Sequence, residues 1–277
     1  MDSLSPTQIS VLALESLLVL AGIIAWIRQP REHVKPLDWG APLTDTLMLL
    51  WAVMLSAFLG QLAGAMMLKF LPATSGNAQA VQAIIIVVTT DGAAIAAWLA
   101  VHAFLRGGGQ PLPVSIEGPL RLGPTSTQGG VAFLRVLPVV MATGLAWGTV
   151  IHALGLPETQ QGIVDIFEET SSAIAIAGLA LVAVVLVPIA EELVFRAGLF
   201  RVLAAKYGRW PGILISSAVF AAIHMSWLGF APLFGLGIVF CLAYERSRNI
   251  AVPMIAHGLF NLNSILLIVL PVPDFLK

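Results

Sequence analysis

Charge is what this sequence has least of. Only 10% of its 277 residues are Asp, Glu, Lys or Arg, 58% are hydrophobic, and the mean hydropathy is +0.93. Soluble domains carry about 25% charged residues, so this chain has too little polar surface to cover a soluble core. No charged residue occurs between Trp210 and Tyr244, and about 20 apolar residues suffice for a helix to cross a bilayer. The composition therefore predicts a multi-pass protein embedded in the lipid bilayer.

Cysteine is scarce, and an N-terminal basic segment is lacking. The single Cys241 allows no intrachain disulfide and no cysteine-based metal site. No Lys or Arg precedes Arg28, so the chain lacks the basic region of a cleaved signal peptide, and we expect the first apolar stretch to be a retained helix. A net charge of −1 without a basic arm excludes the usual footprint of nucleic-acid binding.

The apolar runs predict an all-α, polytopic transmembrane helix bundle with about eight spans. We expect these helices near residues 9–27, 45–68, 81–105, 131–153, 171–196, 211–226, 229–245 and 250–270. The division between the sixth and seventh is the least distinct. Gly and Pro crowd the segment 106–130, which we expect to be an irregular loop, and 154–170 has the pattern of an amphipathic connector.

The positions of Lys and Arg predict the orientation, because cytoplasmic loops are enriched in both residues. If both termini lie outside, alternate loops hold most of the basic side chains: Arg28, Arg31, Lys35, Arg106, Arg121, Arg201, Lys206, Arg209, Arg246 and Arg248. The outer segments then keep only Lys69 and Lys277, and the connector 154–170 carries only acidic charges. We therefore expect an even number of spans, with the N- and C-termini outside.

Two adjacent carboxylates and an arginine follow the long uncharged stretch from Ser171 to Ala190. An ion in the hydrocarbon costs roughly 2.5–3.5 kcal/mol even on lenient scales, so ionisable residues there are usually functional. On a helix, Glu192 and Arg196 stand four residues apart in the order that suits an ion pair. Glu191 lies about 100° around the helix from Glu192. The spacing predicts that Arg196 neutralises Glu192, while Glu191 is available as a general base.

Two other apolar helices supply polar groups. His224 follows Phe220 by four residues, and Asn261 follows His257 by four, which places each pair on one helix face. Together with Glu191, these residues could activate a water molecule. The two histidines and Asn261 would then either stabilise an oxyanion or, with the carboxylate, hold a divalent metal ion. We expect Phe220 to pack around such a site.

These three motifs resemble the CPBP family of intramembrane endopeptidases, the CAAX-protease and bacteriocin-processing group that is also called Abi. The resemblance covers about residues 171–265 and rests on the ordered motifs Glu-Glu-x-x-x-Arg, Phe-x-x-x-His and His-x-x-x-Asn, here Glu191, Glu192, Arg196, Phe220, His224, His257 and Asn261. It implies a helical membrane protease that cleaves a peptide or membrane protein and in which Glu191 activates the attacking water. His224 would assist, and His257 with Asn261 would complete an oxyanion or metal site.

The resemblance also suggests a division of the chain. Residues 131–277 form the predicted catalytic helical core, and residues 1–130 carry N-terminal helices and a Gly/Pro-rich loop with no recognised motif. From the helix lengths we expect the site to lie toward the cytoplasmic half of the bundle. One departure from the family pattern is Ala197, where members commonly have Gly.

Other interpretations compete with a protease. Glu191, Glu192 and Arg196 could mark a helix end at the membrane surface, and the histidines could simply bridge helices. A proton-coupled transporter would use the same residues as a relay, but inverted repeats or paired broken helices are absent from the sequence pattern. A non-catalytic relative that binds a peptide, as an immunity protein does, would be expected to lack a motif residue, and every one is present.

The sequence leaves metal dependence open. Glu191, His224 and His257 could form a zinc site with an open position for water. However, the two histidines do not share a helix at the spacing of the common zinc-protease motif, and Asn261 suits an oxyanion better than zinc. We favour a metal-independent glutamate mechanism. The oligomeric state and the substrate are not encoded in any pattern that we recognise.

Overall fold

The computed structural model describes residues 4–30, 43–70, 76–107, 122–156 and 162–270, and within these ranges the regular structure is entirely helical. Seven helices are long and apolar enough to cross a membrane. The helix in place of the predicted sixth span is apolar but has only 15 residues. The predicted bundle of about eight spans is therefore confirmed, with one span shorter than expected. The helices are α1 (Pro6–Ile27), α2 (Leu43–Leu68), α3 (Gly76–Gly107), α4 (Leu122–Ala153), α5 (Gly162–Glu169), α9 (Arg209–Ile223), α10 (Phe230–Ser247), α11 (Ala251–Val269) and a longer helix described next.

The longest helical segment runs for 35 residues from Ala173 to Tyr207 and contains two π-helical stretches. It consists of α6 (Ala173–Leu181), the π-helix η1 (Val182–Leu186), α7 (Val187–Glu192), the π-helix η2 (Leu193–Phe200) and α8 (Arg201–Tyr207). A helix ending at 196 was therefore the wrong expectation. Glu192, Arg196 and Arg201 are buried in the bundle, and the helix continues to Gly208, whose φ of 94° ends it.

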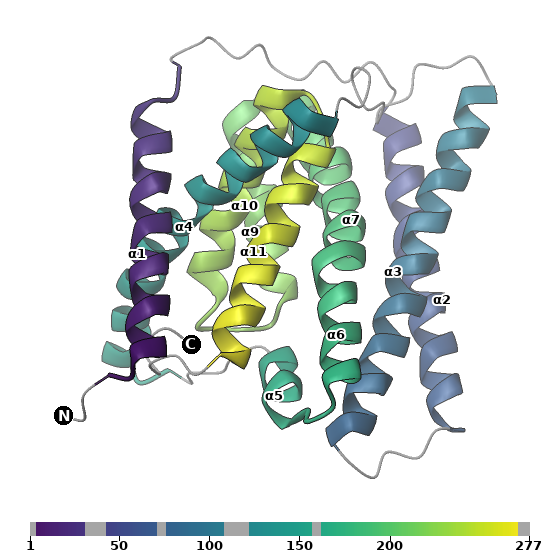
Figure 1. Ribbon diagram of the computed structural model, residues 1–277. Coiled ribbons are helices and arrows are strands. Elements are labelled where there is room, and N and C mark those ends of the chain that lie inside the picture. The colour runs from purple at the N-terminus through teal and green to yellow at the C-terminus, as the bar shows by residue number, and fades with distance from the viewer. Residues whose placement is uncertain (1–3, 31–42, 71–75, 108–121, 157–161, 271–277) are drawn as a thin grey trace.

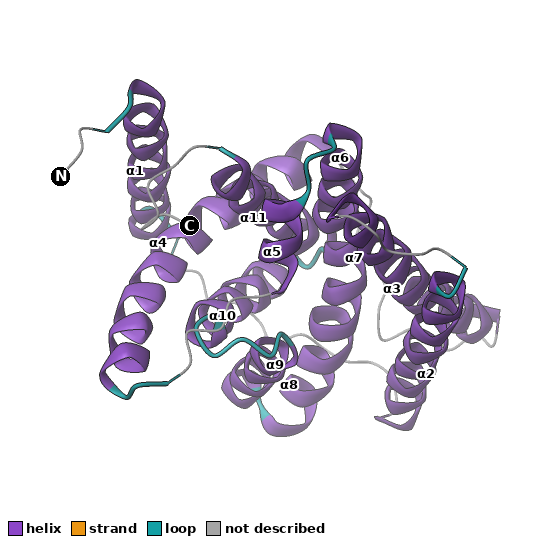
Figure 2. Cartoon of the chain, turned by 90° about the horizontal axis from the view of Figure 1, so that it is seen from below, coloured by secondary structure: helices purple, strands orange, loops and turns teal. Residues whose placement is uncertain are grey.

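The bundle is arranged in three parts (Figure 1). Helices α2 and α3 pack against each other along one side, and α1 packs against α4 on the opposite side. Helices α9, α10 and α11 lie between them (Figure 2). The start of α1 and the end of α11 lie at the same end of the bundle (Figure 1), as an even number of passes requires. Whether that end faces outward remains a prediction.

The start of α4 corrects a second expectation. The Gly/Pro-rich segment was predicted to be a loop up to residue 130, but α4 already begins at Leu122. Pro124 falls in the first turn, where its missing N–H leaves no helical hydrogen bond unmade. A Cβ on Gly129 would lie 2.6 Å from Cγ2 of Ile255, so this glycine serves close helix packing. The division proposed at 130/131 consequently falls inside α4 and stays a prediction.

The acidic connector contains the short helix α5 in its described part. Phe167 is buried, whereas Glu168 and Glu169 are exposed, as an amphipathic helix at the bundle end requires. Phe167 packs in a cluster with Ala80, Ala175, Leu179 and Ile265. This cluster ties α5 to α3, α6 and α11 at the end of the bundle opposite Tyr207.

Candidate active site

Glu192 and Arg196 form a buried ion pair at the junction of α7 and η2. The Arg196 Nη1 donates to Glu192 Oε1 over 3.0 Å, and the side chains are 1% and 0% exposed. The predicted pairing has the expected geometry. The alternative of a helix end at the membrane surface is wrong for this segment, because the helix continues to Tyr207 and both charges face inward.

Glu191 faces two histidines from other helices. His257 Nε2 of α11 lies 3.6 Å from Glu191 Oε2, and His224 Nε2 at the end of α9 lies 3.9 Å from Glu191 Oε1. The Glu191 side chain is 20% exposed, while its Oε2 is buried with no hydrogen-bond partner among the described residues. Glu191, His224 and His257 therefore lie together, and the Glu191 carboxylate can still accept a hydrogen bond.

Both histidines are held in place through Nδ1. His224 Nδ1 lies 2.7 Å from the carbonyl oxygen of Phe220, and His257 Nδ1 lies 3.0 Å from Glu192 Oε1. Since a carbonyl and a carboxylate only accept, each Nδ1 carries the hydrogen. Each Nε2 is thereby directed at Glu191, with a lone pair when the ring is neutral and an N–H when the ring is protonated. Glu192 thus has a second role that the sequence did not suggest, the orientation of His257.

Aromatic rings enclose the charged groups. The Arg196 guanidinium carbon lies 4.4 Å from the centroid of Phe220 and 5.2 Å from that of Phe240. Phe220 also packs on His224, with 4.8 Å between ring centroids, and Phe240 packs on His257 at 5.2 Å. The predicted packing role of Phe220 agrees with these contacts. Phe240 was missed, because one phenylalanine in a long uncharged run has no distinguishing signal.

Asn261 contacts the long helix and not the carboxylates. Its Nδ2 donates to the carbonyl oxygen of Ala183 in η1 over 2.8 Å. The π-register pairs the N–H of Val187 with Val182, and Ala183 would next pair with residue 188. That residue is Pro188, which has no N–H. Asn261 supplies the missing donor, so the structure gives it an anchoring contact, and its predicted part in an oxyanion site stays untested.

The spacing of the donor atoms around Glu191 decides whether they could hold a metal ion. Among the residues that the structure describes, no group of three or more His, Cys, Asp or Glu side chains gathers closely enough to hold a metal ion. The Glu191 oxygens lie 3.9 and 3.6 Å from His224 and His257, whereas ligands of one tetrahedral zinc ion lie roughly 3.3 Å apart. As placed, these side chains do not form a zinc site.

Comparison with known proteins identifies the segment that carries the site. Residues 173–263 match the family model described as "Type II CAAX prenyl endopeptidase Rce1-like". The chain is 26% identical over 141 residues to "Putative membrane peptidase YdiL" of Bacillus subtilis (strain 168), covering 50% of this chain and 55% of that one. It is 39% identical over 80 residues to "Membrane-embedded CAAX protease MroQ" of Staphylococcus aureus (strain USA300), covering 27% of this chain and 32% of that one.

The matched region thus spans about half and about a third of these two relatives. The family match at residues 173–263 includes Glu191, Glu192, His224 and His257. No solved structure matches the chain.

Proposed function

We propose that the chain is an intramembrane endopeptidase of the Rce1-like CAAX-protease (CPBP) family, since residues 173–263 match the model of that family. It hydrolyses a peptide bond of a membrane-associated protein or peptide. The observation that carries the proposal is the Glu191 carboxylate, which lies inside an apolar bundle and faces the Nε2 atoms of His224 and His257. This arrangement suits the activation of water beside a carbonyl group.

In the proposed reaction, Glu191 takes a proton from a water molecule, and the resulting hydroxide adds to the carbonyl carbon of the scissile bond. The carbonyl oxygen becomes an oxyanion. As the C–N bond breaks, the proton on Glu191 passes to the nitrogen of the leaving amine. Each carboxylate oxygen has a histidine beside it, so the reacting atoms would lie between Glu191 and the two rings.

The histidines stabilise the oxyanion in this scheme. Since Nδ1 of His224 and of His257 already donates to a fixed acceptor, only Nε2 can reach the substrate. Donation from Nε2 requires a protonated ring, so the reactive form has at least one imidazolium. Donors preorganised around a developing oxyanion typically contribute about 2.7–4 kcal/mol each to lowering the barrier.

The ion pair behind the site positions His257. Glu192 Oε1 accepts from both Arg196 Nη1 and His257 Nδ1 at 3.0 Å, and Phe220 and Phe240 pack over Arg196. Burial leaves this network few alternative arrangements, which fixes the ring of His257 relative to Glu191. We assign Glu192, Arg196 and Phe220 positioning roles, and Glu191, His224 and His257 direct roles. Asn261 acts on the site through η1.

The basic residues at one end of the bundle support an orientation in the membrane. We place both termini outside and the basic end of the bundle in the cytoplasm, defined by Arg28, Lys206, Arg209, Arg246 and Arg248. The site opens toward that half of the membrane. We also propose a mechanism that is independent of metal, because the Glu191 oxygens lie farther from the nearest nitrogens of His224 and His257 than the ligands of one zinc ion lie from each other.

Membrane proteomics of cells that carry the wild type or Glu191→Ala tests the activity. We expect a small set of membrane-associated precursors to accumulate uncut in the variant. The wild-type protein, purified in detergent, should then cleave a synthetic peptide from such a precursor, and Glu191→Gln should not. Binding of the precursor without cleavage by the wild type would instead support a non-catalytic peptide-binding protein. Proton-coupled uptake into proteoliposomes without cleavage would support a transporter.

A further inference from the structure

A third carboxyl group lies near the candidate active site and comes from the N-terminal helices. Asp91 is half-buried in α3, a helix that packs against α6, η1 and α7. Its charge is close enough to Glu191 to act on it electrostatically. Asp91 lies outside residues 173–263, the segment that matches the family model, so that match assigns it no role.

Contacts along α3 set the level of Asp91 against the long helix. At the start of α3, Asn77 Oδ1 accepts a hydrogen bond from the backbone N–H of Ser172, directly before α6, over 2.9 Å. Two turns later, a Cβ on Gly178 would lie 3.0 Å from Cδ1 of Ile84. The two helices therefore run side by side in the same direction (Figure 1). Asp91 follows two further turns along the same face of α3, which places it beside η1 and the start of α7.

Polar groups interrupt the apolar face of α3 at this level. Earlier on the helix, Ala80 belongs to the apolar cluster that ties α5 to the bundle. Later on the helix, Ala94 belongs to the cluster that contains Leu193. Between them, Thr90 Oγ1 is buried without a hydrogen-bond partner, and Asp91 has neither a hydrogen bond nor an ion pair, within the described part of the chain. This stretch of α3 thus has hydrogen-bonding groups that contacts within the bundle leave unused.

Glu15, another carboxyl group in an apolar helix, differs from Asp91 in this respect. Glu15 Oε2 of α1 accepts from Asn263 Nδ2 of α11 over 3.4 Å. Ionisable side chains inside a membrane are costly, and they usually pair with another group or line the path of a substrate. Glu15 has its partner within the protein. We infer that the partner of Asp91 is a group of the substrate.

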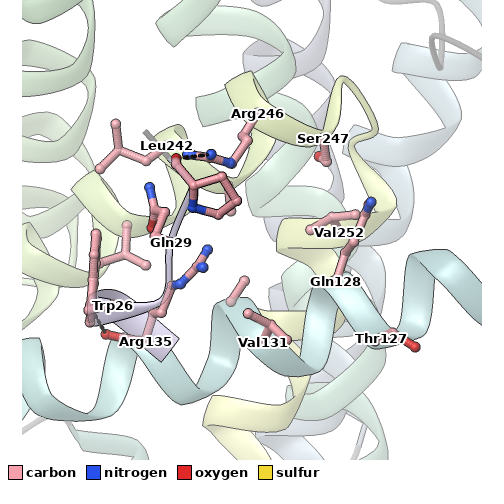
Figure 3. A pocket seen from close by; sticks show the side chains of 14 residues that line it. Trp26, Gln29, Thr127, Gln128, Val131, Arg135, Leu242, Arg246, Ser247 and Val252 are labelled. Carbon is pink, nitrogen blue, oxygen red and sulfur yellow. Dashed lines mark hydrogen bonds between the residues drawn. The ribbon is translucent and has the colours of Figure 1, made fainter. Parts of the chain in front are cut away.

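The charges around Glu191 favour a cation as that group. Arg196 is the basic residue that acts on Glu191 electrostatically, and it is already paired with Glu192. With Glu191 and Asp91 ionised, the site keeps an excess of negative charge even when one histidine is protonated. By contrast, the cavity of about 430 Å³ between α1, α4, α10 and α11 has no carboxylate among the described residues that line it (Figure 3).

We propose that Asp91 is a specificity-determining residue, which binds a Lys or Arg side chain of the substrate close to the scissile bond. The carboxylate accepts a charge-assisted hydrogen bond from the ammonium or guanidinium group. Membrane proteins carry Lys and Arg mainly at the cytoplasmic ends of their spans, the half of the membrane to which we assign the site. The substrate is then a membrane segment with a basic residue at that end. This inference rests on the proposed function, which makes the site one that binds peptides.

Binding of defined peptides tests the proposal without cleavage. A fluorescent apolar peptide of Ala and Leu has Lys, norleucine or Glu at its centre, and its affinity for the full chain with Glu191→Gln is measured in detergent. This background removes the Glu191 charge, so a charge preference reports on Asp91. We expect the Lys peptide to bind about tenfold more tightly than the norleucine peptide, because a hydrogen bond to a charged group contributes about that much. The Glu peptide should bind most weakly.

Variants assign the preference to one carboxylate. Asp91→Asn in the same background should abolish the difference between the Lys and norleucine peptides, because the amide keeps the shape and loses the charge. Asp91→Glu keeps the charge and should retain the preference, which a purely structural role would not explain. Glu15→Gln is the matched control, since it removes a carboxylate from another apolar helix and should leave the preference intact. Equal affinities for the two peptides, a Lys preference that survives Asp91→Asn, or its loss in Glu15→Gln would overturn the assignment.

Turnover by the wild type separates this inference from the proposed function. If the peptides are cleaved, kcat/KM should be higher for the Lys peptide than for the norleucine peptide, and Asp91→Asn should lose this difference. A Lys preference in binding without any cleavage would contradict the endopeptidase and support the cation site. Cleavage with equal kcat/KM and equal affinity for both peptides would support the endopeptidase and refute the cation site.

Discussion

At the scale of single residues, Glu191 and Glu192 are neighbours with different surroundings. Glu192 is fully buried and shared between Arg196 and His257. Glu191 is partly exposed, and its oxygens lie 3.9 and 3.6 Å from the Nε2 atoms of His224 and His257. Glu192 Oε1 accepts two structural hydrogen bonds on a side chain without exposed surface, whereas Glu191 is 20% exposed and within reach of a water molecule. We therefore expect removal of the Glu191 charge to affect cleavage and removal of the Glu192 charge to affect stability.

Glu191→Gln should abolish cleavage while leaving the protein folded and inserted. The amide keeps the shape of the side chain but cannot accept a proton from water. Loss of a catalytic base typically lowers the rate by about 10²–10⁴-fold. The measurement is turnover of a precursor peptide by purified protein, with the thermal midpoint in detergent as the control for folding. Near-normal turnover would remove Glu191 from the mechanism.

Glu192→Gln should act chiefly on stability. The substitution leaves Arg196 as a buried charge without its counter-ion, and breaking a buried pair in this way costs about 3–5 kcal/mol. The thermal midpoint in detergent should fall clearly more than for Glu191→Gln, the matched control one residue away. Equal losses in the two variants would contradict the division of labour between the carboxylates.

At the scale of elements, the proline in the long helix explains a contact with α11. Pro188 cannot donate to the carbonyl of Ala183, and Asn261 fills that position from the neighbouring helix. Nearby, a Cβ on Gly258 would lie 2.5 Å from the carbonyl oxygen of Val184. The π-register, the proline and the small residue together let α11 approach η1 closely. The same approach brings His257, one residue before Gly258, next to α7.

Asn261→Leu should therefore destabilise the protein by about 1 kcal/mol, the typical contribution of one hydrogen bond, because the half-buried carbonyl of Ala183 loses its donor. Pro188→Ala restores a backbone N–H at the position that can pair with Ala183. The double variant should consequently lose less stability than the sum of the two single variants, as measured by thermal or denaturant unfolding in detergent. Strict additivity would show that Asn261 does not compensate for the proline.

Gly258→Ala tests the close approach directly. The added methyl group must displace η1 from α11, so we expect a loss of stability together with a loss of cleavage as His257 moves away from Glu191. Gly148→Ala in α4 is the matched control, because its Cβ would meet nothing within 4 Å, and replacing a glycine by alanine inside a helix stabilises by roughly 0.5–1 kcal/mol where there is room. Unchanged activity in Gly258→Ala would indicate that the η1–α11 contact does not position His257.

At the scale of the whole molecule, the sequence predicted the spans well wherever apolar runs were uninterrupted. The sequence-based prediction failed at residues whose role is set by contacts between helices. Gly129 resembles a loop residue but packs against Ile255, and the charges at 191–196 resemble a membrane boundary but turn inward. The burial of these charges depends on helices far along the chain, which no local pattern reports.

The site was predictable in part, for a related reason. Spacing at i,i+4 shows which side chains share a helix face, so Glu192 with Arg196 followed from the sequence. Which helices then meet is a property of the bundle. The contact of Phe240 with His257, the double role of Glu192 and the bond from Asn261 to Ala183 are all interhelical or register-dependent, and these are the features that sequence reasoning missed.

Metal dependence follows from how the helical segments that carry Glu191, His224 and His257 meet. His224 and His257 approach opposite oxygens of Glu191 from separate helices, and the described residues contain no three-member metal cluster. Purified protein treated with a chelator should keep its activity, and elemental analysis should find less than one zinc per chain. The control is a zinc-dependent protease in the same detergent, which the chelator must inactivate. Activity that is lost on chelation and restored by zinc alone would require the helices to close around a metal, with both histidines as ligands.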